Sequence, residues 1–223
     1  MKAFKISFIV LAVIFSLAFS VCSGIFYLKR FTFNEDKPLE KWNKMILNRE
    51  VTYIPIKYGN EGFIRAVSIK ACSALYYRLN FKLNEYPLLS WKWKVVKFPD
   101  LSFVRNEKDR DDFAARVYVI FPFLNFSMSR FIEYVWAEDL PAGAIIENPL
   151  AKNVKLIVVR SGKAQINDWL SESRNVYEDY VKAFGEKPRR KVGAIAMMCD
   201  ADSSKSEAES LFDEITITSQ PAR

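Results

Sequence analysis

Apolar residues follow two patterns along this chain, one continuous and one alternating. The stretch from Ile6 to Leu28 carries no charged residue, whereas the rest of the chain mixes apolar and polar positions in short runs. A helix as long as the first stretch spans the roughly 30 Å of a bilayer core. Alternation with a period of two is typical of strands that bury one face. We therefore expect an apolar N-terminal helix followed by a β-rich domain.

The alternation is clearest in the run from Leu88 to Phe98, where Trp91, Trp93 and Val95 share one face and lysines occupy the other. Such a run predicts a half-solvated antiparallel strand. A hairpin-like turn, Gly59-Asn60-Glu61-Gly62, separates two further runs. On these criteria, strands are expected at 51–58, 63–70, 73–81, 88–98, 114–121, 131–136, 155–160, 192–199 and 212–218.

Three helices are expected in the body. A period near 3.6 and a Gly-then-Pro stop predict one from Ser173 to Phe184. Shorter helices are expected from Leu39 to Leu47 and, after a capping-box pattern, from Ser204 to Leu211. Strands do not alternate with crossover helices, so we predict an all-β fold: a two-sheet antiparallel β-sandwich, jelly-roll-like. The expected organisation is a signal or anchor at 1–30, a polar connecting segment at 31–50 and the sandwich at 51–223.

The role of the N-terminal segment is open between two interpretations. Small residues near Ala18 and Ser20 suit a cleaved signal peptide, whereas the apolar run to Lys29-Arg30 suits an uncleaved transmembrane anchor. Lipid attachment at Cys22 fits less well, because bulky residues precede it. Basic residues slightly favour the N-terminus inside and the domain outside. The expected location is the cell envelope, either anchored in the inner membrane and facing the periplasm or secreted to the periplasm, with residues 6–28 as the membrane contact.

Composition excludes several classes of function. Four of the basic residues, Lys2, Lys5, Lys29 and Arg30, flank the apolar segment; without them 29 basic side chains face 26 acidic ones, so the net charge of +7 does not indicate a nucleic-acid partner. The chain has no histidine, which excludes Ser-His-Asp and Cys-His nucleophiles. With few cysteines as well, a zinc site is not expected. Any chemistry must use carboxylates, Lys, Arg, Tyr or an oxygen-ligated metal.

Seven short strings of residues stand out along the body of the chain: 90–95, 112–119, 133–136, 158–162, 174–179, 183–186 and 198–203. Together, in this order, they resemble the bacterial domain of unknown function 3047 family over about residues 50–218. The resemblance implies an exported, single-domain bacterial protein with no established activity. The closing run, 212–217, is similar to the last strand of galactose-binding-like jelly-roll modules, an analogy of fold alone.

Two groups of residues are candidate sites. Asp200, Asp202 and Ser204 place oxygens at alternating positions after a strand, which suits calcium; a plain turn with a helix cap is the alternative. Trp91, Trp93, Tyr118 and Trp136 could form an aromatic platform on which sugars stack; a sandwich core is the alternative. Side chains that could complete a ligand site, or instead form internal salt bridges, are Asp112, Arg116, Arg160 and Arg174.

Three functions remain open from the sequence. The first is a membrane-tethered envelope module that binds glycan, and the second is a glycan-acting enzyme that uses paired carboxylates. The third is an envelope scaffold without a small ligand. No catalytic motif favours the enzyme, although Asp112, Glu133, Asp200 and Asp213 have the right chemical type. Exposure of Trp91 and Trp93 distinguishes the first function from the third.

Overall fold

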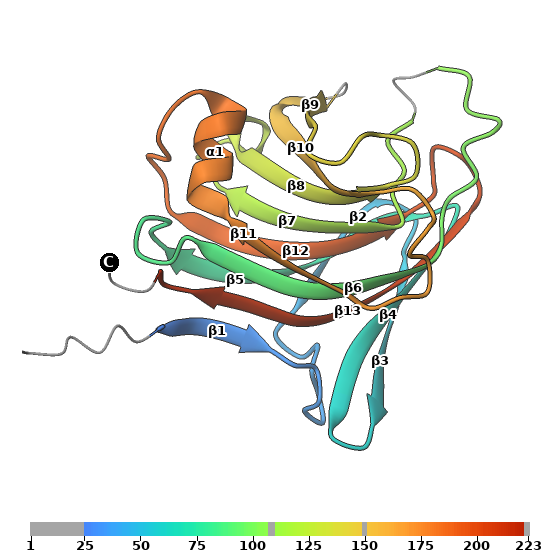
Figure 1. The fold of residues 1–223 in the computed structure, drawn as a ribbon, viewed down its shortest axis with the longest axis horizontal. Coiled ribbons are helices and arrows are strands. Elements are labelled where there is room, and N and C mark those ends of the chain that lie inside the picture. Colours follow the sequence, from blue (N-terminus) through green and yellow to red (C-terminus); the bar gives the residue numbers. More distant parts are fainter. Residues whose placement is uncertain (1–24, 107–109, 149–150, 221–223) are drawn as a thin grey trace, which may run out of the picture.

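The fold is a sandwich of two β-sheets, seen in a computed structural model that describes residues 25–106, 110–148 and 151–220 (Figure 1). One sheet has six strands and the other has seven. The six-stranded sheet runs in the order β11 (Leu170–Asn175), β6 (Leu88–Lys97), β13 (Glu207–Thr218), β4 (Glu61–Ile69), β3 (Thr52–Tyr58), with β1 (Tyr27–Phe31) also paired to β13.

The seven-stranded sheet contains one parallel pair, β8 with β10, and its other pairs are antiparallel. The predicted two-sheet β-sandwich is confirmed, with this pair as an exception to its antiparallel pattern. A short 3-10 turn, Phe126–Met128, precedes β8. The strand order is β2 (Asn43–Asn48), β5 (Cys72–Phe81), β12 (Val192–Asp200), β7 (Ala115–Phe121), β8 (Arg130–Ala137), β10 (Ala151–Ser161), β9 (Ile145–Asn148).

The main core lies between the sheets and follows the predicted alternation. On β6, Trp91, Trp93 and Val95 are buried, while Lys92 and Lys94 are half-buried on the opposite face. A second apolar cluster covers part of the outer face of the seven-stranded sheet, around Phe113, Val135 and Leu156. This sheet is therefore apolar on both faces near β8 and β10.

One α-helix, α1 (Val176–Phe184), is present among the described residues. The Asn175 side chain caps its start by accepting a hydrogen bond from the Glu178 amide, and Gly185 ends it in the left-handed conformation. The helix was expected from Ser173, but residues up to Asn175 belong to β11, since they pair with β6.

The two other predicted helices are wrong. Residues Asn43–Asn48 form β2, which pairs with β5 at the sheet edge. Residues from Glu207 onward form β13, which pairs with β4 on one side and β6 on the other. A strand with neighbours on both sides satisfies its backbone groups at every position, and this outweighs a local capping pattern.

The segment predicted to connect the anchor to the sandwich is itself part of the sandwich. Phe31, at the end of β1, is buried and packs edge-on against Trp42 and Tyr77, with ring centroids 5.0 and 4.8 Å apart. Strand β1 also takes up Tyr27 and Leu28, so the predicted apolar helix cannot continue through these two residues. Residues 6–24 lie outside the described part of the chain. Within the described part, no helix has the length and apolar character to cross a membrane.

Candidate functional site

The three tryptophans of the predicted platform lie in the core. Trp91, Trp93 and Trp136 are 1%, 0% and 1% exposed. The Trp91 and Trp93 ring centroids are 5.3 Å apart, and the Trp93 and Trp136 centroids are 6.0 Å apart. Tyr118 lies elsewhere, on the outer face of the seven-stranded sheet, where it is also buried. The platform interpretation of these rings is therefore wrong, because no sugar can reach them.

Arg160 and Arg174 form internal ion pairs. Arg160 Nε donates to Glu172 Oε1 at 2.6 Å, and Arg174 Nη2 donates to Asp179 Oδ1 at 2.6 Å. Both carboxylates are buried. A core ring supports each pair: Trp93 Nε1 donates to Glu172, and the Tyr134 hydroxyl donates to Asp179. The first pair joins β10 of one sheet to β11 of the other, and the second joins β11 to α1, so both arginines make internal structural contacts.

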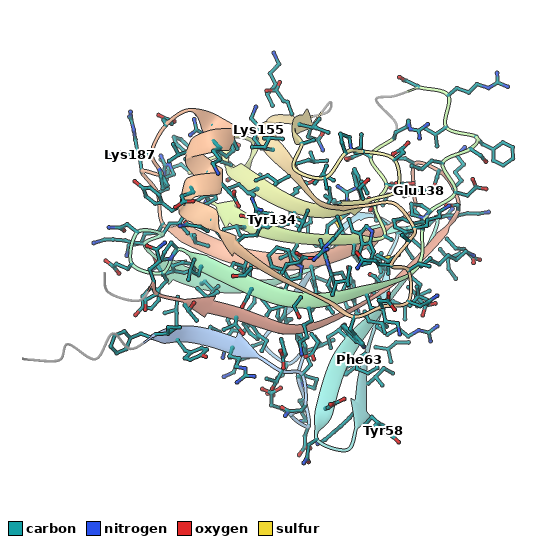
Figure 2. All side chains as sticks on the ribbon, in the orientation of Figure 1. Tyr58, Phe63, Tyr134, Glu138, Lys155 and Lys187 are labelled. Atoms are coloured by element: carbon teal, nitrogen blue, oxygen red, sulfur yellow. The ribbon has the colours of Figure 1, made fainter. Side chains whose placement is uncertain are left out.

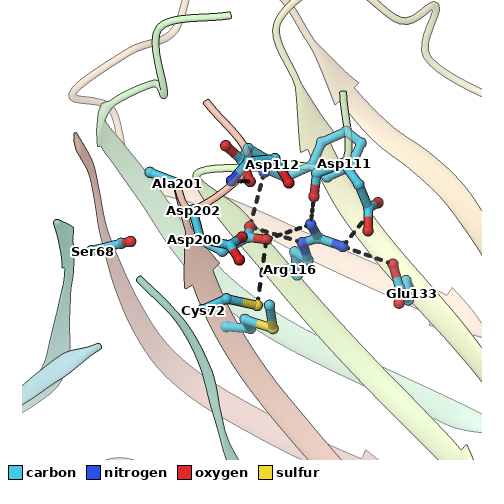
Figure 3. Close-up of polar contacts among 12 residues, drawn as sticks. Ser68, Cys72, Asp111, Asp112, Arg116, Glu133, Asp200, Ala201 and Asp202 are labelled. Atoms are coloured by element: carbon cyan, nitrogen blue, oxygen red, sulfur yellow. Dashed lines mark hydrogen bonds and ion pairs between the residues drawn. The ribbon is translucent and has the colours of Figure 1, made fainter. Parts of the chain in front are cut away.

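Arg116 lies at the centre of a buried charge cluster on the outer face of the seven-stranded sheet (Figure 3). Its Nε and Nη2 donate to Asp200 Oδ1 and Oδ2 at 3.1 and 2.7 Å. Its Nη1 donates to Glu133 Oε2 at 3.1 Å and to Asp111 Oδ1 at 3.4 Å. The three buried side chains come from three strands: Arg116 from β7, Glu133 from β8 and Asp200 from β12. Because these residues are far apart in the chain, the sequence does not show that they meet.

The same cluster fixes the loops above the sheet. The Phe113 amide donates to Asp200 Oδ1 at 2.9 Å, and Arg116 Nη2 donates to the Asp111 carbonyl. Asp112 accepts from the amides of Ser203 and Ser204 at 3.2 and 2.6 Å. The predicted pair Asp112 and Arg116 therefore lies in one network, and that network joins the segment before β7 to the turn after β12.

The charge of the cluster is unbalanced, with three carboxylates around one guanidinium. Burial raises the pKa of Glu133 and that of Asp200 to about 7, despite the opposing effect of Arg116. A proton taken up near neutral pH reduces the excess negative charge. Carboxyl groups tuned in this way occur at functional sites and also in structural ion-pair networks.

The predicted calcium ligands do not form a calcium site. Ligand atoms of Cys72, Asp200 and Asp202 lie within 4.8 Å of one another, but the Ser204 hydroxyl pairs with that of Ser206 at 2.8 Å. Both Asp200 oxygens accept from Arg116, whose charge opposes a cation there. Burial raises the pKa of the Cys72 thiol, and a neutral thiol is a poor partner for a hard cation. The residues present do not fit calcium.

A pocket of about 690 Å³ lies beside the cluster, lined by loops at one end of the sandwich. Asp111, Asp112 and Phe113 connect it to the cluster. Its lining is mixed, since Phe98, Leu101, Val104, Leu140, Ile146 and Leu156 are apolar, whereas Arg105, Arg110, Glu138, Asp139 and Glu147 are charged. Arg110 pairs with Asp139 across its rim.

A second hollow, of about 580 Å³, lies against the outer face of the six-stranded sheet and contains an exposed tryptophan. Trp169, just before β11, is 40% exposed, and its ring meets that of Phe63 on β4 edge-on, with centroids 5.6 Å apart. We call this hollow the Trp169 groove. Its other lining residues are polar or small: Arg30, Thr32, Asn34, Asn60, Glu61, Gly62, Lys92, Ser171, Asp213 and Glu214.

Two of the three carboxylates that line the Trp169 groove, Asp213 and Glu214, lie at a bulge in β13. The register with β6 shifts between Asp213 and Thr216, and Glu214 has a φ of 49°, in the left-handed region. Glu214 pairs with Lys92 at 3.0 Å and with Arg30 at 3.7 Å. Burial, together with the nearby Glu214 and Glu61, raises the pKa of Asp213 to about 6. Backbone strain of this kind occurs at ligand sites.

Trp169 and Phe63 are not among the site residues predicted from the sequence. The sequence did carry a signal for Trp169, because it follows the polar residues Asn167-Asp168 and lies outside any alternating run. Such a position indicates a loop and not a buried strand face. Asp213 was a candidate only by chemical type. Nothing local indicated that β4, β6, β11 and β13 would bring these side chains together.

The fold is similar to that of solved carbohydrate-binding modules. The xylan-binding domain CBM22-1 of Paenibacillus barcinonensis Xyn10C has a TM-score of 0.45 at 10% identity, over 88% of this chain and 96% of that one. The mannan-recognising module TmCBM27 has a TM-score of 0.43 at 6% identity, over 88% and 99%. The family 30 module of a Clostridium thermocellum cellulosomal cellulase has a TM-score of 0.43 at 11% identity, over 82% of this chain and 93% of that one. These likenesses concern the sandwich alone.

Comparison at the level of sequence identifies the family. No curated protein matches the chain. The family described as "Protein of unknown function (DUF3047)" matches residues 40–216, which takes in β2 to β13 apart from the last residues of that strand. The chain belongs to the DUF3047 family of proteins of unknown function.

Proposed function

We propose that the chain is a glycan-binding module whose site is the Trp169 groove. The observation that carries the proposal is the exposed Trp169 ring beside Phe63, in a hollow otherwise lined by hydrogen-bonding side chains. Sugar rings place their C–H faces on aromatic rings, and their hydroxyls need carboxylate, amide or guanidinium partners. The Trp169 groove supplies both within one concave surface.

The polar side of the groove is held in position before a ligand binds. The Thr32 hydroxyl donates to Asn34 Oδ1 at 2.7 Å, and Asn34 Nδ2 donates to the Asn60 carbonyl at 3.3 Å. The Glu214 amide donates to Asp213 Oδ1 at 2.6 Å. Side chains positioned in this way lose little conformational entropy on binding, which favours affinity for a flexible glycan.

We further propose that the module acts in the cell envelope, held at a membrane by the apolar segment 6–24. The support is the sequence alone, since that segment is uncharged and long enough to cross most of a bilayer. The sandwich begins at Tyr27, so the tether leaves almost no linker between membrane and domain.

A glycan array with the full chain in detergent tests the binding proposal. We expect at least one glycan to bind, and Trp169→Ala to weaken that binding about tenfold or more. Tyr58→Ala is the matched control, since Tyr58 is an exposed ring on β3 of the same sheet but does not line the groove. Absence of binding by a folded chain, or equal binding by Trp169→Ala, would reject the proposal.

One observation favours a second candidate function at the same groove. The raised pKa of Asp213, about 6, would let it act as a general acid, with Glu61 or Glu214 as the second carboxylate. A glycan-acting enzyme would release product from a bound glycan, and Asp213→Asn would abolish release while retaining binding. If the chain binds a glycan but releases no product from it, the non-catalytic binding module is the remaining function.

A further inference from the structure

The end of the sandwich at which the described chain begins carries an unusual surface. Strand β1 starts there, β7 runs into the loop 122–129 there, and the segment 185–191 joins α1 to β12 there (Figure 1). We call this the entry end. The pocket beside the Arg116 cluster lies at the opposite end, as the positions of Lys187 and Glu138 show (Figure 2).

The loop 122–129 presents apolar side chains to solvent. Its sequence is Pro-Phe-Leu-Asn-Phe-Ser-Met-Ser. Leu124 is 100% exposed and Met128 is 55% exposed. A fully exposed leucine buries no apolar area and so does not stabilise the fold. Grouped exposed apolar residues mark contact surfaces.

The segment 185–191 adds a concentrated positive charge beside that loop. It contains four basic residues, Lys187, Arg189, Arg190 and Lys191, against one acidic residue, Glu186. All four basic residues are exposed. The Arg190 guanidinium lies 3.7 Å from the centroid of the Phe123 ring, which joins the basic segment to the apolar loop. Between them lies a hollow of about 530 Å³ that also includes Met128, Arg130 and Arg189.

The N-terminal residues add a third apolar element. Phe26 and Tyr27 are 68% and 63% exposed, and the Phe26 amide donates to Ser219 Oγ at 2.9 Å, at the end of β13. The chain that precedes Ile25 is the apolar segment 6–24. Whatever membrane that segment enters is therefore close to the entry end.

We propose that the entry end docks on a lipid bilayer that contains anionic phospholipid. Leu124 and Met128 enter the boundary between headgroups and acyl chains, and Arg189, Arg190 and Lys187 bind headgroup phosphates. Exposed apolar side chains surrounded by Lys and Arg are the pattern of proteins that lie on membrane surfaces. Guanidinium groups suit phosphate because they can donate two parallel hydrogen bonds.

The bilayer fits better than a protein partner for two reasons. The chain preceding the described residues is apolar and ends at this surface, and the charge of the surface complements anionic headgroups. Docking would also fix the orientation of the sandwich, with the end that holds the 690 Å³ pocket directed away from the membrane. The proposal does not rest on glycan binding, which uses the Trp169 groove.

The test measures the depth of the loop on vesicles. The full chain carries Cys22→Ser and Leu124→Cys, and a polarity-sensitive dye is attached at position 124 before reconstitution into vesicles. The remaining cysteines, Cys72 and Cys199, are buried and so do not take up the dye. Phe103→Cys is the matched control, since Phe103 is 83% exposed and belongs to the loop that follows β6 at the opposite end. We expect a blue shift and quenching by lipid-borne quencher at position 124, and none at 103, on phosphatidylcholine mixed with phosphatidylglycerol. Phosphatidylcholine alone should give a weak response.

Charge reversal tests the basic segment separately. Arg189→Glu with Arg190→Glu should abolish the response at position 124, since each basic residue near an anionic surface contributes about fivefold, or ~1 kcal/mol, to the inserted population. The control is Arg105→Glu with Lys70→Glu, two exposed basic positions outside the loop 122–129 and the segment 185–191. This variant should leave the response at position 124 intact. If the dye at position 124 shows neither a blue shift nor lipid quenching on anionic vesicles, the bilayer proposal is overturned. A protein partner would then be the occupant of this surface. Equal responses at 124 and 103, or no effect of charge reversal, also overturn it.

Discussion

Arg116 on β7 and Asp200 on β12 form a two-point ion pair across neighbouring strands, with both Asp200 oxygens within 3.1 Å of guanidinium nitrogens. Both side chains are almost fully buried. Glu133 joins the pair from β8, on the other side of β7. Three strands are thus connected by side chains as well as by their backbone ladder.

Arg116→Met should lower the free energy of unfolding by about 3–5 kcal/mol, because it leaves buried carboxylates without their cation. Urea denaturation at neutral pH measures the loss. Arg65→Met is the matched control: Arg65 pairs with Glu209 at 2.7 Å, but both side chains are partly exposed, so the cost should stay below about 1 kcal/mol. Equal losses in the two variants would contradict a special role for the Arg116 cluster.

Stability should fall as pH rises from about 5 to 7. The folded pKa values of Glu133 and Asp200 are about 7, above their ordinary values of 4.5 and 3.8, so the folded chain binds more protons than the unfolded chain in this interval. The stabilisation is therefore present at the acidic end and lost as pH rises, by at most about 1.4 kcal/mol per pH unit for each group. Thermal melts across this range measure it. Glu133→Gln should flatten the profile, and an unchanged slope would argue against Glu133 as a source.

Gly62→Ala should be destabilising by about 1–3 kcal/mol, because a Cβ at this position would lie 2.2 Å from the carbonyl oxygen of Phe33. The backbone would have to move, and Gly62 lines the Trp169 groove, so glycan binding should weaken as well. Chemical denaturation and the glycan assay measure the two effects. Gly59→Ala, in the same hairpin but in open space, should cost only the strain of its left-handed conformation, ~1 kcal/mol. A larger loss in the control would contradict the close approach of Phe33.

Calcium should leave the melting temperature unchanged, because Arg116 occupies both oxygens of Asp200 and the Ser204 hydroxyl pairs with Ser206. Melting curves with added calcium and with chelator measure this. Asp202→Asn serves as a control, and it should behave like the parent chain in both conditions. A rise with calcium that chelator reverses and Asp202→Asn removes would restore the calcium interpretation.

Strong alternation in the sequence was enough to predict most of the sandwich. The runs containing Trp91 and Val117 formed strands close to the predicted bounds, and Gly185 ended the helix as expected. The prediction was wrong where local signals competed with pairing. Residues 204–211 carry a capping pattern, yet the strand that starts at Glu207 has partners on both sides.

The buried charge cluster and the Trp169 groove were predictable only in part. Asp112, Arg116 and Asp200 were selected from the sequence, and the structure joins them in one buried network. The aromatic residues were assigned to the wrong place, because alternation shows that Trp91 and Trp93 share a face but not whether a second sheet covers it. Trp169, which lies outside the alternating runs, is the one tryptophan of the five that stays exposed.

The sequence was sufficient to predict the apolar N-terminal segment, the β-rich class, the absence of histidine chemistry and most strand positions. These properties depend on local periodicity and residue type, which a linear chain displays directly. The folded chain was needed to show which sheet faces are covered, which carboxylates surround Arg116, and that Trp169 contacts Phe63 in the groove that also contains Asp213. Those contacts join residues far apart in the chain through sheet order and register, and neither is encoded in any single segment.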